Sequence, residues 1–151
     1  MEKMTKKERV IAAINKEEVD RIPFSIWYHL PKVDQDPVQL AEVQIKQAHL
    51  YDLDFIKMMP FGNYSAHDFG LSCTFFCTET EPVFERKFAI NDPKEWTELK
   101  ALPGCFGSHG KQLQLAREFK KQLNGEEIPY VQTIFSPLTT AKKLAGTRVF
   151  D

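Results

Sequence analysis

The N-terminal segment, residues 5–28, limits the fold more than any other part of the chain. Thr5 and Glu8 have the spacing of a capping box, in which each side chain accepts a hydrogen bond from the other residue's backbone N–H. Apolar residues then recur on one helical face, at Val10, Ile11 and Ile14. Residues 24–28 form a run with almost no polar side chain, which predicts a strand buried on both faces. One natural context is a helix that closes the end of a parallel barrel.

Proline and glycine divide the rest of the chain into alternating helices and strands. Asp36 and Pro37 have the residue types that begin a helix, and Asn124 and Gly125 have the types that end one. We expect helices over 37–50, from 93, over 108–123 and from 137 to 146. Further strands are expected over 54–59 and 130–135, and a hairpin within 71–90. This order predicts an α/β fold with about three βα units and one inserted β-hairpin.

Several segments, taken in order, resemble one known family. The opening helix and strand are followed by Asp-Leu-Asp-Phe-Ile-Lys, His-Asp-Phe-Gly-Leu and Glu-Pro-Val-Phe-Glu-Arg, at 52–57, 67–71 and 81–86. Asn-Asp-Pro at 91–93 and Ser-Pro-Leu-Thr-Thr-Ala at 136–141 continue the series. Together they resemble the uroporphyrinogen decarboxylase superfamily, which also contains corrinoid-dependent methyltransferases. The resemblance spans nearly the whole chain and implies a (β/α)8 TIM barrel.

The chain is short for such a barrel. A (β/α)8 barrel typically has about 250 residues, whereas this chain has 151. We therefore expect residues 1–151 to form a single domain, the N-terminal half of a truncated (β/α) barrel. Thr147 could cap a further helix for which no residues remain. A truncated protein, a frameshifted gene and a half-barrel completed by a second chain all fit this ending.

Charge and hydropathy exclude several classes of partner. The 20 basic and 21 acidic side chains leave a net charge of -1, which argues against general binding of nucleic acid. The sequence has neither a secretory signal nor an apolar stretch long enough for a membrane span. We expect a cytoplasmic protein that binds neither nucleic acid nor a membrane.

The cysteines indicate thiols rather than a disulfide framework. Their number is three, and they lie at Cys73, Cys77 and Cys105. The spacing of Cys73 and Cys77 predicts two half-buried side chains on one face of a strand. We expect no metal site in this chain.

In a (β/α) barrel, functional side chains lie at the C-terminal ends of the strands. This rule selects His29 as the candidate catalytic residue, because an imidazole with a pKa near 6.5 exchanges protons at neutral pH. The candidate substrate-binding residues are Tyr28, Phe61, Asn63, Tyr64 and Ser136. A lone loop histidine is more often merely exposed, and a Phe-Gly-Asn-Tyr turn needs no ligand. Asp68 is expected to cap or turn a segment rather than to catalyse.

Two departures from the family pattern bear on function. In the decarboxylases, an Arg-Gln-Ala-Gly-Arg-Tyr segment after the first strand binds the carboxylates of the porphyrinogen, whereas residues 28–33 here read Tyr-His-Leu-Pro-Lys-Val. The decarboxylases also carry an essential aspartate after the second strand, near the position of Phe61. Both departures favour the methyltransferase branch, in which zinc activates a thiol acceptor. The resemblance places the zinc ligands of that branch in the second half of the protein, beyond this chain.

Three functions remain open. The first is an enzyme that handles a small-molecule or protein-bound tetrapyrrole by corrinoid-dependent methyl transfer. Its cofactors would be zinc and a corrinoid protein, with none held within this chain. The second is uroporphyrinogen III decarboxylase, an enzyme of haem and porphyrin biosynthesis. The third is a non-catalytic half-barrel that forms a homodimer through its open strand edges. We expect the 151-residue chain alone to be inactive.

Overall fold

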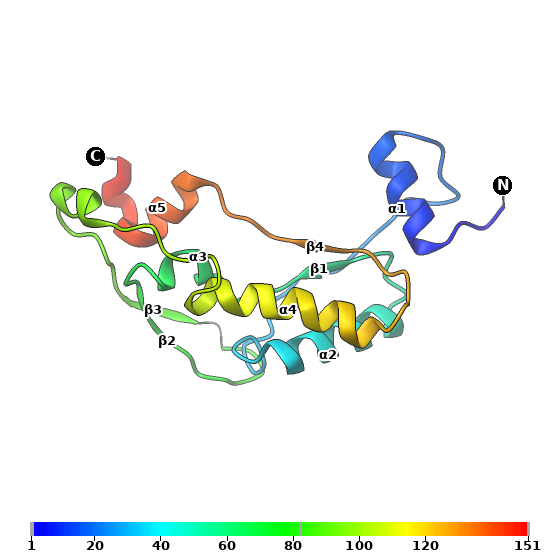
Figure 1. The fold of residues 1–151 in the computed structure, drawn as a ribbon, viewed down its shortest axis with the longest axis horizontal. Coiled ribbons are helices and arrows are strands. Elements are labelled where there is room, and N and C mark those ends of the chain that lie inside the picture. Colours follow the sequence, from blue (N-terminus) through cyan, green and yellow to red (C-terminus); the bar gives the residue numbers. More distant parts are fainter. Residues whose placement is uncertain (1, 82, 151) are drawn as a thin grey trace.

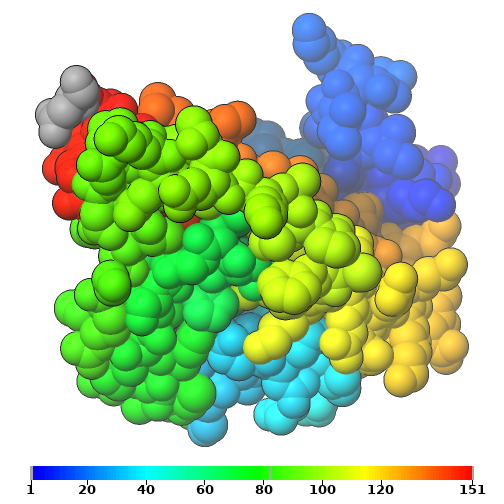
Figure 2. Space-filling model, turned by 60° about the vertical axis from the view of Figure 1, so that its left-hand side comes forward, coloured from blue at the N-terminus to red at the C-terminus, as the bar shows by residue number. Residues whose placement is uncertain are grey.

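Helix α1 (Lys6–Asn15) begins at the predicted capping box in the computed structural model of the protein, which describes residues 2–81 and 83–150. The Thr5 hydroxyl accepts a hydrogen bond from the Glu8 backbone N–H, and the Glu8 carboxylate accepts one from the Thr5 N–H at 2.8 Å. This prediction is confirmed. Figures 1 and 2 both show α1 standing off from the rest of the molecule.

The centre of the fold is a pair of parallel strands. Strand β1 (Ile56–Met58) pairs with β4 (Tyr130–Gln132), with Ile56 opposite Tyr130 and Met58 opposite Gln132. Both strands were predicted, but each is shorter than its apolar run. The C-terminal ends of the two strands therefore lie at the same edge (Figure 1).

The strand predicted over residues 24–28 is wrong, because this segment forms no ladder. Its one backbone hydrogen bond to the β1 region, among the described residues, runs from the Asp54 N–H to the Phe24 carbonyl at 3.0 Å. Trp27 is 49% exposed and Ile26 is 37% exposed, so the segment is not buried on both faces either. An apolar run supplies a surface to bury, but regular hydrogen bonding to a neighbour decides whether it becomes a strand.

Two long helices cover one face of the strand pair (Figure 1). Helix α2 (Pro37–Leu50) starts at Asp36, whose carboxylate accepts hydrogen bonds from two backbone N–H groups. Helix α4 (Gly107–Leu123) ends at Asn124, which adopts the left-handed conformation with a φ of 44°. Both caps were predicted. The two helices pack against each other and against the strands, as expected for the outer layer of a βαβ unit.

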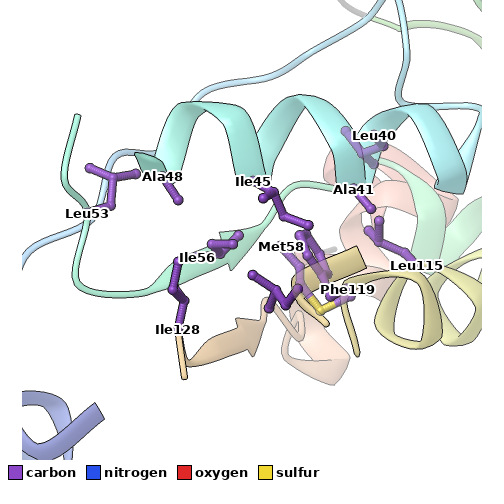
Figure 3. Close-up of a cluster of buried hydrophobic side chains, with 11 residues drawn as sticks. Leu40, Ala41, Ile45, Ala48, Leu53, Ile56, Met58, Leu115, Phe119 and Ile128 are labelled. Carbon is purple, nitrogen blue, oxygen red and sulfur yellow. The ribbon is translucent and has the colours of Figure 1, made fainter. Parts of the chain in front are cut away.

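The main core lies between these helices and the strands. Figure 3 shows side chains from α2, β1 and α4 pointing toward one another. The cluster includes Leu40, Ile45, Ile56, Met58, Leu115 and Phe119. Phe119 also stacks on Tyr130 of β4, with 5.3 Å between the ring centroids. This core holds the strand pair in place, and with it the edge at which the strands end.

The predicted hairpin follows β1. Strands β2 (Ser72–Thr74) and β3 (Phe84–Lys87) pair antiparallel, and the short 3-10 helix η1 (Pro93–Glu98) follows them with Asp92 as its cap. The prediction that Cys73 and Cys77 share one face of a strand is wrong. Strand β2 ends at Thr74, and Cys77 lies beyond it, exposed and with a φ of 55°. All three cysteines are free thiols, as predicted.

A second, smaller core joins the hairpin to the C-terminal helices. It includes Ala66, Leu71, Ile90 and Leu144. Helix α5 (Pro137–Ala145) is capped by Ser136, as its sequence predicts, and leads into the 3-10 helix η2 (Gly146–Phe150). The short helix α3 (Tyr64–His67) was not predicted. In Figure 2 the hairpin region and the C-terminal helices gather on one side of the molecule. No helix among the described residues is long and apolar enough to cross a membrane.

A buried ion network fixes α1 to the start of β1. The Asp54 carboxylate is fully buried and accepts hydrogen bonds from the guanidinium groups of Arg9, at 2.6 Å, and Arg21. Asp20 accepts two further hydrogen bonds from Arg9, at 2.6 and 2.7 Å. Burial opposes ionisation of Asp54, but the hydrogen bonds from Arg21, the Phe24 N–H and Arg9 hold its pKa below the usual range.

We expect the substitution Asp54→Asn to destabilise the protein by about 3 kcal/mol at pH 7, because it leaves two arginines facing a neutral amide in a buried site. The depressed pKa means that the ionised carboxylate stabilises the fold above its unfolded pKa, and this contribution is lost as the pH falls through the folded-state value. The difference from the wild type should therefore shrink in acid. Urea unfolding midpoints from pH 7 to pH 3 measure both effects.

The matched control for this prediction is Asp52→Asn. Asp52 lies two residues away, with a side chain that is 78% exposed, and pairs with Lys6 at the surface. Its substitution should leave the midpoint almost unchanged. Equal losses for the two variants would contradict the role assigned to Asp54.

Candidate functional site

The C-terminal edge of the parallel strands gathers most of the predicted site residues. Asn63 and Tyr64 follow β1, and the segment that leads to Ser136 follows β4. The Tyr64 hydroxyl donates a hydrogen bond to the Thr133 carbonyl at 2.6 Å, which joins the two connections. Ligands in α/β folds bind at this edge.

A cavity of about 200 Å³ opens at this edge. We call it the polar cavity. Its lining consists of His29, Pro31, Asp34, Gly62, Asn63, Val83 and Glu85. It brings together two residues selected from the sequence, His29 and Asn63, with two carboxylates that sequence reasoning missed. Four polar side chains from three separate segments thus line one small space.

Asp34 is the most unusual group in the polar cavity. Its residue is only 6% exposed, and its carboxylate accepts a hydrogen bond from the Gln35 side-chain amide at 2.9 Å. Burial raises the pKa of Asp34 to about 6, although Gln35 and the charge of Lys111 act in the opposite direction. A carboxyl group with this pKa exchanges protons close to neutral pH, as general acids and bases require.

His29 is held mainly in its neutral form. Burial and the nearby charge of Lys143 lower its pKa, and a hydrogen bond to the Pro60 backbone opposes them in part. Its ring packs edge-on against Trp27, with 4.9 Å between the centroids. A neutral imidazole is a proton acceptor at pH 7. Asp34 and His29 therefore supply a carboxyl group and an imidazole whose pKa values are shifted toward each other.

Asn63 connects the polar cavity to a half-buried lysine. The Lys143 ammonium donates a hydrogen bond to the Asn63 side-chain oxygen at 2.8 Å and lies 5.0 Å from the centre of the Phe135 ring. Burial lowers the pKa of Lys143, while Glu85 and Cys73 raise it in part. Burial also raises the pKa of the Cys73 thiol, and a hydrogen bond with Asn63 opposes this. Lys143 therefore acts on Glu85 of the cavity, whereas the charge of Lys111 acts on Asp34.

The other predicted site residues lie outside the polar cavity. Phe61 is 1% exposed, and its ring packs edge-on against His67 and Phe75. It is therefore a buried packing residue and does not line the polar cavity. The Tyr28 phenol lies beside Gln47 and Tyr51 at the end of α2. Ser136 caps α5 by accepting a hydrogen bond from the Thr139 N–H at 3.1 Å.

Asp68 caps a helix, as predicted. Its carboxylate accepts hydrogen bonds from the backbone N–H groups of Ser108, at 2.8 Å, and His109, at 3.1 Å, in the first turn of α4. Gly107 makes room for it, because a Cβ atom at this position would lie 2.2 Å from the Asp68 Oδ1 atom. A ligand is not needed to explain this aspartate.

No set of three His, Cys, Asp or Glu side chains within residues 2–81 and 83–150 is arranged to hold a metal ion.

Comparisons with known proteins identify relatives of the chain. The family model described as uroporphyrinogen decarboxylase (URO-D) matches residues 5–150. A methyltransferase from Methanosarcina mazei has a similar structure, with a TM-score of 0.79 and 18% sequence identity. The match covers 98% of this chain and 47% of that protein, so the chain spans about half the length of the solved structure that it matches. At this identity the likeness concerns the fold. No curated protein sequence matches the chain.

The raised pKa of Asp34 makes a testable prediction about stability. Because the folded state holds the Asp34 proton more tightly than the unfolded state, this group costs stability as the pH rises from about 4 to about 6. Asp34→Asn should therefore be more stable than the wild type at pH 7, by about 2 kcal/mol, and equal to it below pH 4. Urea unfolding at pH 3.5, 5 and 7 measures the difference.

Asp36→Asn serves as the control, because hydrogen bonds from Gln39 and its other neighbours lower the pKa of Asp36. This variant should show no gain at pH 7. A difference between Asp34→Asn and wild type that does not change with pH would refute the raised pKa.

Proposed function

Because the chain belongs to the uroporphyrinogen decarboxylase (URO-D) family, we propose that it forms the N-terminal half of a (β/α)8 barrel in an enzyme that handles a tetrapyrrole by corrinoid-dependent methyl transfer. The family match over residues 5–150 and the parallel strand pair covered by helices support the barrel. The chain covers 47% of a methyltransferase with a similar fold, which supports the proposal that it forms one half of a barrel.

The observation that carries the proposal is that Asp34 and His29 both line the polar cavity, at the C-terminal edge of the strands. Methyl transfer to a thiol requires the thiol to lose its proton. The neutral imidazole of His29 can accept that proton, and the carboxyl group of Asp34 can hold or return one near neutral pH. Asn63, held by Lys143, can orient a polar group of the acceptor.

One aromatic side chain beside the cavity can contact a flat macrocycle. Trp27 is 49% exposed, and its ring packs edge-on against His29, with 4.9 Å between the centroids. An exposed indole next to an imidazole suits the edge of a tetrapyrrole. A bound corrinoid would supply the methyl carrier, and Trp27 and His29 would orient it.

We propose zinc as a cofactor of the complete enzyme only. The described residues offer no set of three metal-binding side chains, so this chain does not fit a zinc site of its own. We therefore assign no step of the reaction to zinc through these residues.

Decarboxylation of uroporphyrinogen is the alternative, and the polar cavity weighs against it. Its lining contains two carboxylates, Asp34 and Glu85, and no arginine. The neighbouring lysines donate hydrogen bonds to other groups, Lys143 to Asn63 and Lys111 to Gln35. A substrate with several carboxylates needs cationic side chains to bind it, and like charges in the cavity would repel it. The cavity therefore favours methyl transfer.

Ligand binding tests the proposed function. The Trp96→Phe variant retains Trp27 as its single tryptophan, because the chain has two. We expect hydroxocobalamin to quench the Trp27 fluorescence saturably, after correction for absorption, and uroporphyrin to have no effect. In this background His29→Gln should weaken cobalamin binding about fivefold, because it removes an imidazole at the cavity. His49→Gln, at an exposed site beside Glu126, is the control.

Each result of this titration has a distinct meaning. Quenching by uroporphyrin alone would replace methyl transfer with decarboxylation. Quenching by neither tetrapyrrole would exclude both enzymes and leave the non-catalytic half-barrel.

The non-catalytic alternative is favoured by one observation, the exposed apolar side chains near the strand pair. Ile134 is 82% exposed, Ile22 is 83% exposed and Val131 is 44% exposed. The second half of the similar methyltransferase has no counterpart in these residues, and a second copy of the chain could cover the exposed side chains instead. We therefore propose that the isolated chain forms a homodimer that buries Ile134 and Val131.

Light scattering over a range of protein concentrations tests the homodimer. The wild type should have twice the mass of the 17.5 kDa chain, and Ile134→Lys should be a monomer. Leu50→Lys is the control, since Leu50 is 74% exposed at the end of α2, in another part of the structure. A monomeric wild type, or equal dissociation by both substitutions, would rule out this interface.

A further inference from the structure

A second and larger cavity lies among η1, α4 and α5, apart from the polar cavity. Its volume is about 580 Å³, which is within the usual range for small-molecule sites. We call it the apolar pocket. Most of its lining is apolar or aromatic and includes Phe69, Trp96, Leu113, Phe135, Ala141 and Leu144. No residue lines both cavities.

His109 is a polar group in the wall of the apolar pocket, and its orientation is fixed. The Asp68 carboxylate, whose side chain is 5% exposed, lies 3.0 Å from the His109 Nδ1 atom. Burial opposes ionisation of Asp68, but hydrogen bonds from Ser108 and His109 hold its pKa below the usual range. In the neutral imidazole, a proton on Nδ1 facing this carboxylate leaves Nε2 as the acceptor.

The His109 Nε2 atom has no hydrogen-bond partner among the described residues. The side chain is 37% exposed, and its ring packs against Tyr64 and Phe69 at 5.7 and 6.5 Å between centroids. The ring is thus held in place by Asp68 and by aromatic neighbours. This leaves one oriented acceptor at a largely apolar surface.

Two glutamines in the same wall also have unused acceptors. The side-chain amides of Gln112 and Gln132 donate to the carbonyls of Ser108, at 3.2 Å, and Thr133, at 3.1 Å. Their Oε1 atoms are buried and lack a hydrogen-bond partner within the described part of the chain. Buried acceptors are nearly always paired in folded proteins. Because both oxygen atoms are buried, a molecule in the pocket would not reach them, which leaves His109 as the oriented acceptor in this wall.

We propose that the apolar pocket binds an uncharged aromatic molecule that carries an N–H or O–H group, which donates a hydrogen bond to the His109 Nε2 atom. Aromatic side chains in the lining suit a flat ring. The exposed imidazole acceptor suits a donor, and no lysine or arginine in the lining would attract an anion. This site is independent of the polar cavity, so it stands or falls separately from the proposed function.

Indole and benzothiophene test the proposal, because they have almost the same shape and only indole carries an N–H donor. We expect the 151-residue chain to bind indole about fivefold more tightly than benzothiophene, the preference of one hydrogen bond. His109→Phe should bind both compounds equally. His49→Phe, at the surface, is the control and should keep the preference. Affinities come from NMR titrations.

Two further measurements keep the test independent of the folding of His109→Phe. In the wild type, indole and not benzothiophene should shift the Nε2 ¹⁵N resonance of His109. Ala141→Leu should weaken both compounds severalfold, because Ala141 lines the pocket. Equal affinity of the two compounds for the wild type, a preference that survives His109→Phe, or no binding of either compound would overturn the proposal.

Discussion

The buried carboxylate of Asp54 is the contact on which the arrangement of the N-terminal region depends. It lies two residues before β1 and is bound by Arg9 from α1, by Arg21 and by the Phe24 backbone N–H. A buried carboxylate without these partners would be strongly unfavourable. Helix α1, the segment after it and the start of β1 must therefore be ordered together. This fixes the course of residues 24–28 along β1 and carries His29 to the edge where the strands end.

The polar cavity shows what that arrangement makes possible. Asp34 and His29 from the connection before α2 meet Asn63 from the connection after β1, and burial shifts the pKa of both titratable groups. A buried carboxylate that binds no cation directly lowers stability at neutral pH, so the fold would be more stable without it. Groups retained at such a cost are typical of functional sites. The apolar pocket has a different character, since its one oriented acceptor faces aromatic side chains.

Much of the fold was predictable from short-range patterns, and much of the site was not. The caps formed by Thr5, Asp36 and Asn124 follow from residue types at fixed spacings. The strand predicted over residues 24–28 failed because the apolar run does not pair regularly with β1. His29 and Asn63 were found because they follow apolar runs. No local sequence pattern identifies Asp34 or Lys143 as a site residue, because it is burial in the folded protein that shifts the pKa of each.

The sequence by itself determined the helix caps, the alternation of helices and strands, and the family, because all three depend on residues close together or in a fixed order. Tertiary structure alone decided which side chains meet. Residues 29, 63 and 143 lie near one another because α5 and the β1 connection pack at one edge. Whether a carboxylate is paired, as Asp54 is, or left to bind a proton, as Asp34 is, depends on partners distant in sequence. Local sequence fixes the hydrogen bonds within helices and at their caps, whereas long-range packing fixes strand pairing and the burial and charge that give the site its chemistry.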